Sequence, residues 1–198
     1  VADDASILRG ADRITTNIGL LEATRAANPG AVIVYKPHPD VEAGLRPGEI
    51  DDKELLKSAD VVARGADPIS LIEACDEIWT MTSLLGFEAL IRGKPVTCLG
   101  TPFYAGWGLT RDLGKVPERR LRKPDGSLQP RPSLDALVHA ALIDYPRYHD
   151  PVSHRPCPPE VVVERLARGE IPQPGPANRL VARLQGRLAS HAWLWRRQ

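Results

Sequence analysis

Three short segments of this sequence carry side chains that could bind an anionic ligand. The first is Lys36-Pro37-His38-Pro39, where an ammonium group and an imidazole stand on a segment stiffened by two prolines. Lysine offers a point charge and histidine offers one or two donors, so the segment suits a phosphate group. A solvated histidine on a rigid turn is the alternative. The apolar strand predicted just before the segment favours the binding role.

The second segment, Thr80-Met81-Thr82-Ser83, leads into a predicted helix. Hydroxyl groups and free backbone N–H groups at a helix N-terminus attract anions, with help from the helix dipole. An ordinary N-cap is the alternative, and for this segment alone it is the better interpretation. Glu88 follows five residues after Ser83 among apolar neighbours. As a buried carboxylate it could accept hydrogen bonds from ribose hydroxyls, whereas a surface charge would have polar company.

The third segment, GTPFYAGWGLTRD at residues 100–112, interleaves aromatic side chains with glycines. Aromatic rings can wall a ligand, and glycines let the backbone approach it closely. Tyr104, Gly106, Trp107 and Gly108 are therefore candidate binding residues. A packed surface loop is the alternative, and this composition is unusual for a mere connection.

The predicted elements place all three segments directly after strands. Apolar runs at residues 31–35, 60–63, 77–81 and 94–99 are typical of parallel strands, and residues 36–40 must then form a loop. Helices are predicted from a cap at Thr15 or Thr16 to residue 27, and over residues 51–58, 68–75 and 83–93. This alternation indicates an α/β, Rossmann-like parallel sheet with helices on both faces. Ligands bind such sheets at the carboxyl ends of the strands.

The remainder of the chain is predicted to be irregular or helical. Residues 101–132 are loop-like, residues 133–145 form an amphipathic helix, and proline-rich connectors separate two further helices beginning near residues 160 and 178. We therefore divide the chain into a nucleotide-sugar-binding half-domain, residues 1–150, and an extension of proline-rich linkers and carboxyl-terminal helices, residues 151–198.

The last segment, residues 178–198, has the composition of an interfacial helix. It holds five arginines and no acidic residue, its leucines recur every four residues, and two tryptophans lie near its end. Such a helix could lie peripherally on a membrane. A helix that packs its leucines on another half-domain is the slightly better alternative.

Composition excludes several classes of protein. The net charge of +1 argues against a nucleic-acid-binding protein, and no apolar run is long enough to span a membrane. The three cysteines are far apart, which argues against a disulfide framework or a zinc site. No metal motif is present, so we expect no metal and no cofactor. Residue 1 is Val and the one methionine is Met81, so we expect a piece of a longer protein.

Three stretches resemble the capsule polysaccharide β-Kdo transferase family of the KpsC type. They are YKPHPDVEAGLR (35–46), TMTSLLGFEALIRGKPVTCLGTPFYAGWGLTRD (80–112) and LVHAALIDYPRYHDP (137–151). The PFYAGWGLT run is the most specific of these, and the opening VADDASI is similar to the start of the second half of such a domain. The resemblance covers most of residues 1–168.

The resemblance implies a GT-B glycosyltransferase, of which this chain would be the nucleotide-binding half. CMP-Kdo would be the donor, and a lipid-linked glycan at the cytoplasmic face of the inner membrane would be the acceptor. His38 and Ser83 would contact the CMP phosphate, with Lys36, Pro39 and Thr82 beside them, and Glu88 would lie near the ribose or base. His38 and Lys36 would stabilise the leaving phosphate. The nucleophile of a retaining mechanism would lie in the other half.

The resulting hypothesis is a transferase that builds the poly-Kdo linker of capsule, together with the capsule assembly and export machinery. This chain alone is expected to be inactive. A teichoic-acid-type glycerophosphotransferase and a non-catalytic export subunit are the alternatives. The PFYAGWGLT run argues against the first, and the intact Lys36, His38, Ser83 and Glu88 argue against the second.

Overall fold

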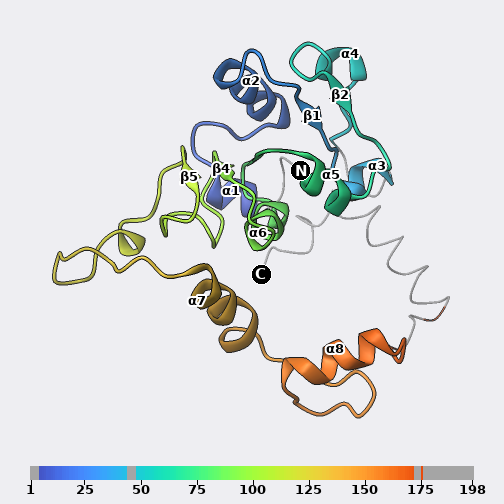
Figure 1. The fold of residues 1–198 in the computed structure, drawn as a ribbon, viewed down its shortest axis with the longest axis vertical. Helices are drawn as coiled ribbons and strands as arrows, with labels where there is room; N and C mark the ends of the chain where they lie inside the picture. Colours follow the sequence, from blue (N-terminus) through green and yellow to red (C-terminus); the bar gives the residue numbers. More distant parts are fainter. Residues whose placement is uncertain (1–4, 44–47, 172–174, 176–198) are drawn as a thin grey trace, which may run out of the picture. The chain divides into compact units, whose positions relative to one another are not determined.

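The computed structural model describes residues 5–43, 48–171 and 175 (Figure 1). The chain divides into two compact units, Val1–Leu134 and Asp135–Gln198. This division comes earlier in the chain than the boundary predicted after residue 150. The arginine-rich segment predicted to be helical, residues 178–198, lies outside the described residues.

The first unit alternates short helices with short strands. In chain order its elements are α1 (Ala5–Gly10), α2 (Asn17–Ala27), β1 (Val34–Tyr35), α3 (Pro39–Glu42), α4 (Asp52–Leu55), β2 (Val61–Val62), α5 (Pro68–Ala74), β3 (Ile78–Thr80), α6 (Leu84–Ile91), β4 (Val96–Cys98), β5 (Arg111–Asp112) and the 3-10 turn η1 (Glu118–Arg120).

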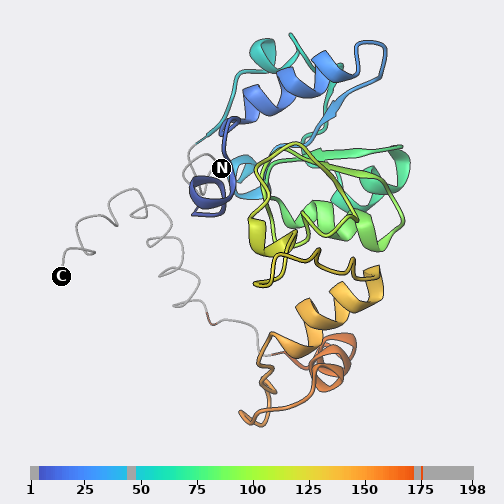
Figure 2. The same ribbon diagram turned by 90° about the vertical axis from the view of Figure 1, so that its left-hand side faces the viewer.

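The strands form two parallel sheets. β1 pairs with β2, and β3, β4 and β5 pair in that order. Figures 1 and 2 show helices flanking these strands. The α/β, Rossmann-like fold class predicted from the sequence is therefore confirmed. β5 was missed, because residues 101–132 were predicted to be loop throughout, and its two residues are a strand only through their pairing with β4.

The first predicted strand is too long. Residues 31–35 were expected to be one buried strand, but β1 holds only the last two of them, and Val32 is 77% exposed. The amide of Ile33 donates to the carboxylate of Asp60 (2.7 Å), and the Ile33 carbonyl accepts the amides of Asp60 and Val61. The Asp60 carboxylate therefore accepts the backbone hydrogen bond that a neighbouring strand would otherwise accept at Ile33.

α2 contributes to two apolar clusters in the core of the first unit. Leu21 of α2 lies in one, with β1 and β2, and Leu20 packs against the other, with β3. The N-cap of α2 is Thr16, whose hydroxyl accepts the amide of Gly19 (3.1 Å), as predicted. The buried members of the two clusters are Leu21, Ile33, Leu55 and Ala59, and Ile7, Met81 and Leu99.

Segments far apart in the chain meet at the end of β4. The amide of Thr101 donates to the Gly10 carbonyl (2.6 Å), and the Thr101 hydroxyl donates to the same oxygen (3.1 Å). A Cβ atom on Gly100 would lie 2.7 Å from that oxygen, so the close approach requires glycine. This contact attaches the end of α1 to the residue that follows β4, at the start of the aromatic loop.

The second unit holds α7 (Leu134–His139), the π-helical turn η2 (Ala140–Asp144) and α8 (Pro159–Ala167). α7 and η2 together match the helix predicted at residues 133–145. The unit is fastened by Asp150, which accepts the Val152 amide (3.0 Å), the Ser153 hydroxyl (2.6 Å) and the Arg165 guanidinium (3.2 Å). These bonds, led by that from Ser153, hold the pKa of Asp150 far below its usual range.

Candidate functional site

His38 begins a helix that was not predicted. Residues 36–40 were expected to be loop, but α3 starts at Pro39, where a helix tolerates proline because the first N–H has no intrahelical partner. The Nδ1 atom of His38 accepts the amide of Asp40 (3.1 Å), which caps the helix. Since Nδ1 accepts, the neutral imidazole carries its proton on Nε2. The side chain is 43% exposed, so this donor is available to a ligand.

Lys36 is already paired. Its ammonium group forms a salt bridge with one carboxylate oxygen of Glu42, and the other oxygen accepts the amide of Gly65 (2.8 Å). Both side chains are mostly buried, at 13% and 16% exposure. The bond from Lys36, then that from Gly65, lowers the pKa of Glu42. The cation assigned to a phosphate from the sequence is thus balanced by an acid six residues further along.

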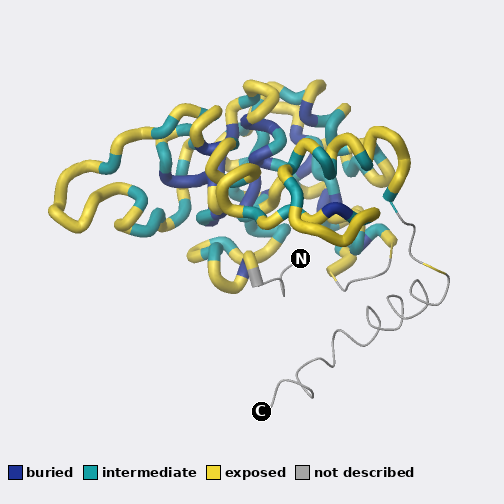
Figure 3. Tube along the Cα trace, turned by 90° about the horizontal axis from the view of Figure 1, so that it is seen from below, coloured by how far each residue is buried: buried dark blue, intermediate teal, exposed yellow. Residues whose placement is uncertain are grey.

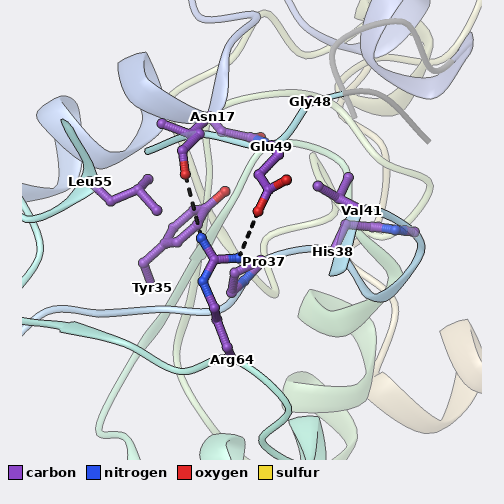
Figure 4. A pocket seen from close by; sticks show the side chains of 10 residues that line it. Asn17, Tyr35, Pro37, His38, Val41, Gly48, Glu49, Leu55 and Arg64 are labelled. Carbon is purple, nitrogen blue, oxygen red and sulfur yellow. Dashed lines mark hydrogen bonds and ion pairs between the residues drawn. The ribbon is translucent and has the colours of Figure 1, made fainter. Parts of the chain in front are cut away.

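A small pocket adjoins His38, and its main charged group was not identified from the sequence (Figure 4). Arg64 lines it, directed toward Asn17 and Glu49, and forms a salt bridge with Asp52 (2.6 Å). Burial raises the pKa of the Tyr35 phenol in the same pocket. Arg64 follows β2, so the rule that directed attention to the ends of the other strands could have found it.

This pocket cannot enclose a nucleotide. Its volume is about 10 Å³, whereas sites for drug-sized ligands measure about 300–1,000 Å³. His38 lies at its rim, with its ring directed away from Arg64 (Figure 4). A ligand on Nε2 of His38 would therefore lie on an open surface of this unit.

Ser83 caps α6, as the sequence predicted. Its hydroxyl accepts the amide of Leu85 (3.2 Å), and its own amide donates to the Thr80 hydroxyl (3.2 Å). Ser83 is exposed, and the hydroxyl of Thr82 lies 3.3 Å from that of Ser6. Two hydroxyl side chains and the positive end of α6 therefore share one exposed turn, an arrangement that favours an anion.

Tyr104 supports this turn from inside the core. It is completely buried, its hydroxyl donates to the Ser83 carbonyl, and its ring stacks on Phe87 at a centroid distance of 6.0 Å. Burial raises the pKa of this phenol strongly, and raises the pKa of the neighbouring Cys98 thiol to about 12. With no exposed surface to offer a ligand in this structure, Tyr104 positions the Ser83 turn.

The glycine-rich loop is folded onto itself by groups that the sequence analysis did not single out. The amide of Gly106 donates to the Asp112 carboxylate (2.9 Å). The guanidinium of Arg120 donates to the carbonyls of Pro102 (2.6 Å) and Ala105 (2.8 Å) and lies over the Trp107 ring at 5.7 Å. Desolvation, followed by the neighbouring Arg119, lowers the pKa of Arg120.

The two glycines that flank Trp107 both have a positive φ angle. Gly106 has φ 82° and Gly108 has φ 80°, a conformation that residues with a Cβ rarely adopt. A Cβ on Gly106 would lie 2.4 Å from Val116, and a Cβ on Gly108 would lie 2.8 Å from Arg131. Trp107 is half-buried and donates its indole N–H to the Phe103 carbonyl (2.8 Å). These contacts fix the conformation of the loop around Trp107.

Glu88 lies on α6 and is half-buried, whereas full burial was expected. Within the described ranges its carboxylate has no hydrogen-bond or ion-pair partner, while its carbonyl accepts the Arg92 guanidinium (2.9 Å). An unpaired, half-buried acceptor can receive a ligand hydroxyl.

Apart from Gly106, Trp107 and Gly108 in the glycine-rich loop, the candidate residues fall into two groups. Lys36, His38 and Pro39 lie at the end of β1, and Thr82, Ser83 and Glu88 lie at and beyond the end of β3 with Tyr104 beneath them. Among the described residues no hydrogen bond joins the two groups. In the same residues no group of three or more His, Cys, Asp or Glu side chains could hold a metal, and no helix is long and apolar enough to cross a membrane.

The sequence and the fold match proteins of capsule synthesis. A family model described as capsule polysaccharide biosynthesis protein matches residues 1–148. The capsule polysaccharide modification protein LipA of Neisseria meningitidis serogroup B is 46% identical over 168 residues, which cover 85% of this chain and 23% of LipA. The lipopolysaccharide-processing protein LpsZ of Rhizobium meliloti is 45% identical over 148 residues, covering 75% of this chain and 32% of LpsZ.

Two solved structures share the fold. The KpsC beta Kdo 2,7 transferase of Thermosulfurimonas dismutans superposes with a TM-score of 0.71 at 40% identity, covering 86% of this chain and 52% of that one. The KpsC beta Kdo 2,4 transferase of the same organism gives a TM-score of 0.62 at 36% identity, covering 82% and 45%. The chain thus spans about half of these structures and a smaller part of the curated relatives.

Proposed function

Since this chain belongs to the capsule polysaccharide biosynthesis protein family, we propose that it forms the donor-binding half of a GT-B glycosyltransferase that transfers Kdo from CMP-Kdo to a lipid-linked acceptor. The observation that carries the proposal is the 40% identity, across most of the chain, to the KpsC beta Kdo 2,7 transferase of Thermosulfurimonas dismutans. Capsule assembly and export proteins would be its partners, at the inner face of the cytoplasmic membrane.

The chemistry that this half contributes is stabilisation of the leaving group. When the bond between Kdo and CMP breaks, negative charge develops on the CMP phosphate. Nε2–H of His38 and the exposed turn at Ser83 would supply hydrogen-bond donors to this charge. Lys36 would act on the same charge by exchanging its partner, so a phosphate would compete with the Glu42 carboxylate for the ammonium group.

The carboxylate of Glu88 would accept a hydroxyl of the ribose or a donor of the base, and Trp107 and the adjoining glycines would line the donor. No metal is required, because protein donors and the helix end carry the charge. The nucleophile of a retaining mechanism would come from the other half of the domain. We therefore expect this chain to bind CMP weakly and to transfer no Kdo alone.

The test of the phosphate site is isothermal titration of CMP into the parent and two His38 variants. His38→Asn keeps an acceptor for the Asp40 amide, because asparagine is a good N-cap, but removes the Nε2 donor. His38→Ala removes both. We expect each variant to lose about 10- to 150-fold in CMP affinity, the value of a charge-assisted hydrogen bond of about 1.5–3 kcal/mol.

Ser83→Ala should weaken CMP binding by a similar factor, and CDP and CDP-glycerol should bind less tightly than CMP to the parent. Parent-like CMP affinity in His38→Asn would exclude the imidazole from the phosphate site. A preference for CDP-glycerol would favour the glycerophosphotransferase alternative, and Kdo transfer by the purified chain would overturn its assignment as half an enzyme.

A further inference from the structure

A basic hairpin, residues 118–129, is the most exposed segment of the first unit that the proposed donor site does not use. It forms the loop at the left of Figures 1 and 3, and every residue from 121 to 128 is exposed. The backbone is nevertheless ordered by hydrogen bonds: the amide of Lys123 donates to the Ser127 carbonyl (2.8 Å), and that of Gln129 to the Leu121 carbonyl (2.8 Å).

The acid in the turn of the hairpin is hydrogen-bonded within the turn. The Asp125 carboxylate accepts both the amide (2.9 Å) and the hydroxyl (2.6 Å) of Ser127, which lowers its pKa. The cations have no such partners. Among the described residues, Arg119, Arg122 and Lys123 form no salt bridge, and the one side-chain bond of Arg122 goes to the Gly126 carbonyl (2.9 Å).

These three cations line an open hollow of about 540 Å³ on the hairpin. The remaining lining consists of Glu118, Pro124, Gly126 and Gln129. Within the described part of the chain, the three cations of this wide hollow lack acidic partners. Such a hollow is suited to the headgroup of an anionic molecule and is not a structural contact of the core.

An apolar side chain, Leu128, shares one face of the hairpin with Arg122. Arg122 and Leu128 are directly opposite in the antiparallel bridge, and the two backbone bonds of the hairpin lie on either side of this pair. Side chains of such a non-hydrogen-bonded pair are close and share one face of the ribbon. Leu128 is 71% exposed and Leu121 is 47% exposed. Burial in the fold therefore does not account for either leucine.

We propose that the basic hairpin is a membrane contact that binds the phosphate headgroups of anionic phospholipids. Arg119, Arg122 and Lys123 hold the headgroups, and Leu128 enters the boundary of the acyl chains. Cations beside an exposed leucine are the combination that an interfacial contact requires. A soluble polyanion would use the cations but gain nothing from Leu128, so the leucine favours the membrane. The inference does not depend on the donor site.

The test is flotation of the full chain with phosphatidylcholine vesicles, with and without phosphatidylglycerol. The triple variant Arg119→Gln, Arg122→Gln, Lys123→Gln should partition onto the anionic vesicles at least about tenfold less than the parent, because each cation near such a surface contributes about fivefold. Salt should weaken the parent's binding. Leu128→Gln should weaken it several-fold, and this loss should persist at high salt.

The matched control is Lys53→Gln, Lys57→Gln, Arg147→Gln, which removes the same charge from exposed positions elsewhere. It should float like the parent. Equal flotation of the hairpin triple variant and this control would overturn the proposal. So would a hairpin variant that loses dextran sulfate binding while Leu128→Gln floats normally, because the surface would then bind a soluble polyanion.

Discussion

The two halves of the candidate phosphate site are supported in opposite ways. The turn at Ser83 rests on the hydrophobic core, through the buried Tyr104 and the close packing around Gly86. The segment at His38 rests on ionic contacts, through the mostly buried salt bridge of Lys36 with Glu42 and the bond from the Gly65 amide to Glu42. Close packing supports the Ser83 turn, whereas a salt bridge supports the segment at His38.

The difference indicates where stability and binding can be separated. Substitutions under the Ser83 turn should alter the free energy of unfolding, because they act on packed core atoms. Substitutions around His38 should alter ligand binding or its pH dependence with little change in the fold. Three substitutions test this contrast, and we order them by the size of the expected effect on stability.

Gly86→Ala should be the most destabilising. A Cβ at this position would lie 2.3 Å from the Tyr104 hydroxyl oxygen and 3.1 Å from Thr80 Cγ2. Overpacking of this kind costs about 1–3 kcal/mol, more than the ~0.5–1 kcal/mol that alanine normally gains over glycine in a helix. Urea unfolding measures the net loss. Gly30→Ala is the control, since no atom lies within 4 Å of its Cβ position. A Gly86→Ala variant as stable as the parent would contradict the claim that close packing supports the Ser83 turn.

Tyr104→Phe should cost less, about 1 kcal/mol, which is the typical net value of one hydrogen bond. The ring keeps its contact with Phe87, and the Ser83 carbonyl still accepts the amide of Gly86 (3.2 Å). The urea midpoint should therefore fall between those of the parent and Gly86→Ala. CMP affinity should fall as well, because the turn that presents Ser83 is less firmly held. Unchanged affinity would mean that Ser83 needs no support from beneath.

Glu42→Gln should have the smallest effect at neutral pH, and that effect should depend on pH. The pKa of Glu42 is lowered in the folded chain, so its contribution to stability is present above the unfolded value near 4.5. The contribution is lost as the pH falls through the folded pKa. The stability difference between parent and variant should therefore shrink below pH 4.5. Glu22→Gln, on the exposed side of α2, is the matched control. A difference that stays constant from neutral to acid pH would contradict an ionic support.

Local signals in the sequence predicted the helices well. Thr16, Asp67 before Pro68, and Ser83 each cap a helix with their own side chains, and such bonds involve neighbours in the chain. α3 was missed altogether, although Pro39 favours a first helical position. It was missed because the two prolines that flank His38 were interpreted as the sign of a loop over residues 36–40.

Contacts between distant residues were less predictable. The strand at residues 31–35 was overextended, because the Asp60 carboxylate occupies the Ile33 amide from 27 residues away. The role of Lys36 depends on Glu42, and that of Tyr104 on the Ser83 carbonyl 21 residues away. The residue types of the candidate site followed from sequence, but their exposure and pairing follow from the fold.

The contact between Gly10 and Thr101 has a consequence for the order of folding. The two residues are 91 positions apart, so the loop between them must close before their hydrogen bonds can form. The pairing of β3 with β4 spans a much shorter stretch, and contacts of short sequence separation form sooner. During refolding, amide protons of β3 and β4 should gain protection from exchange before that of Thr101. The end of α1 should therefore be attached after β3 and β4 have paired, and its release should be an early event in unfolding.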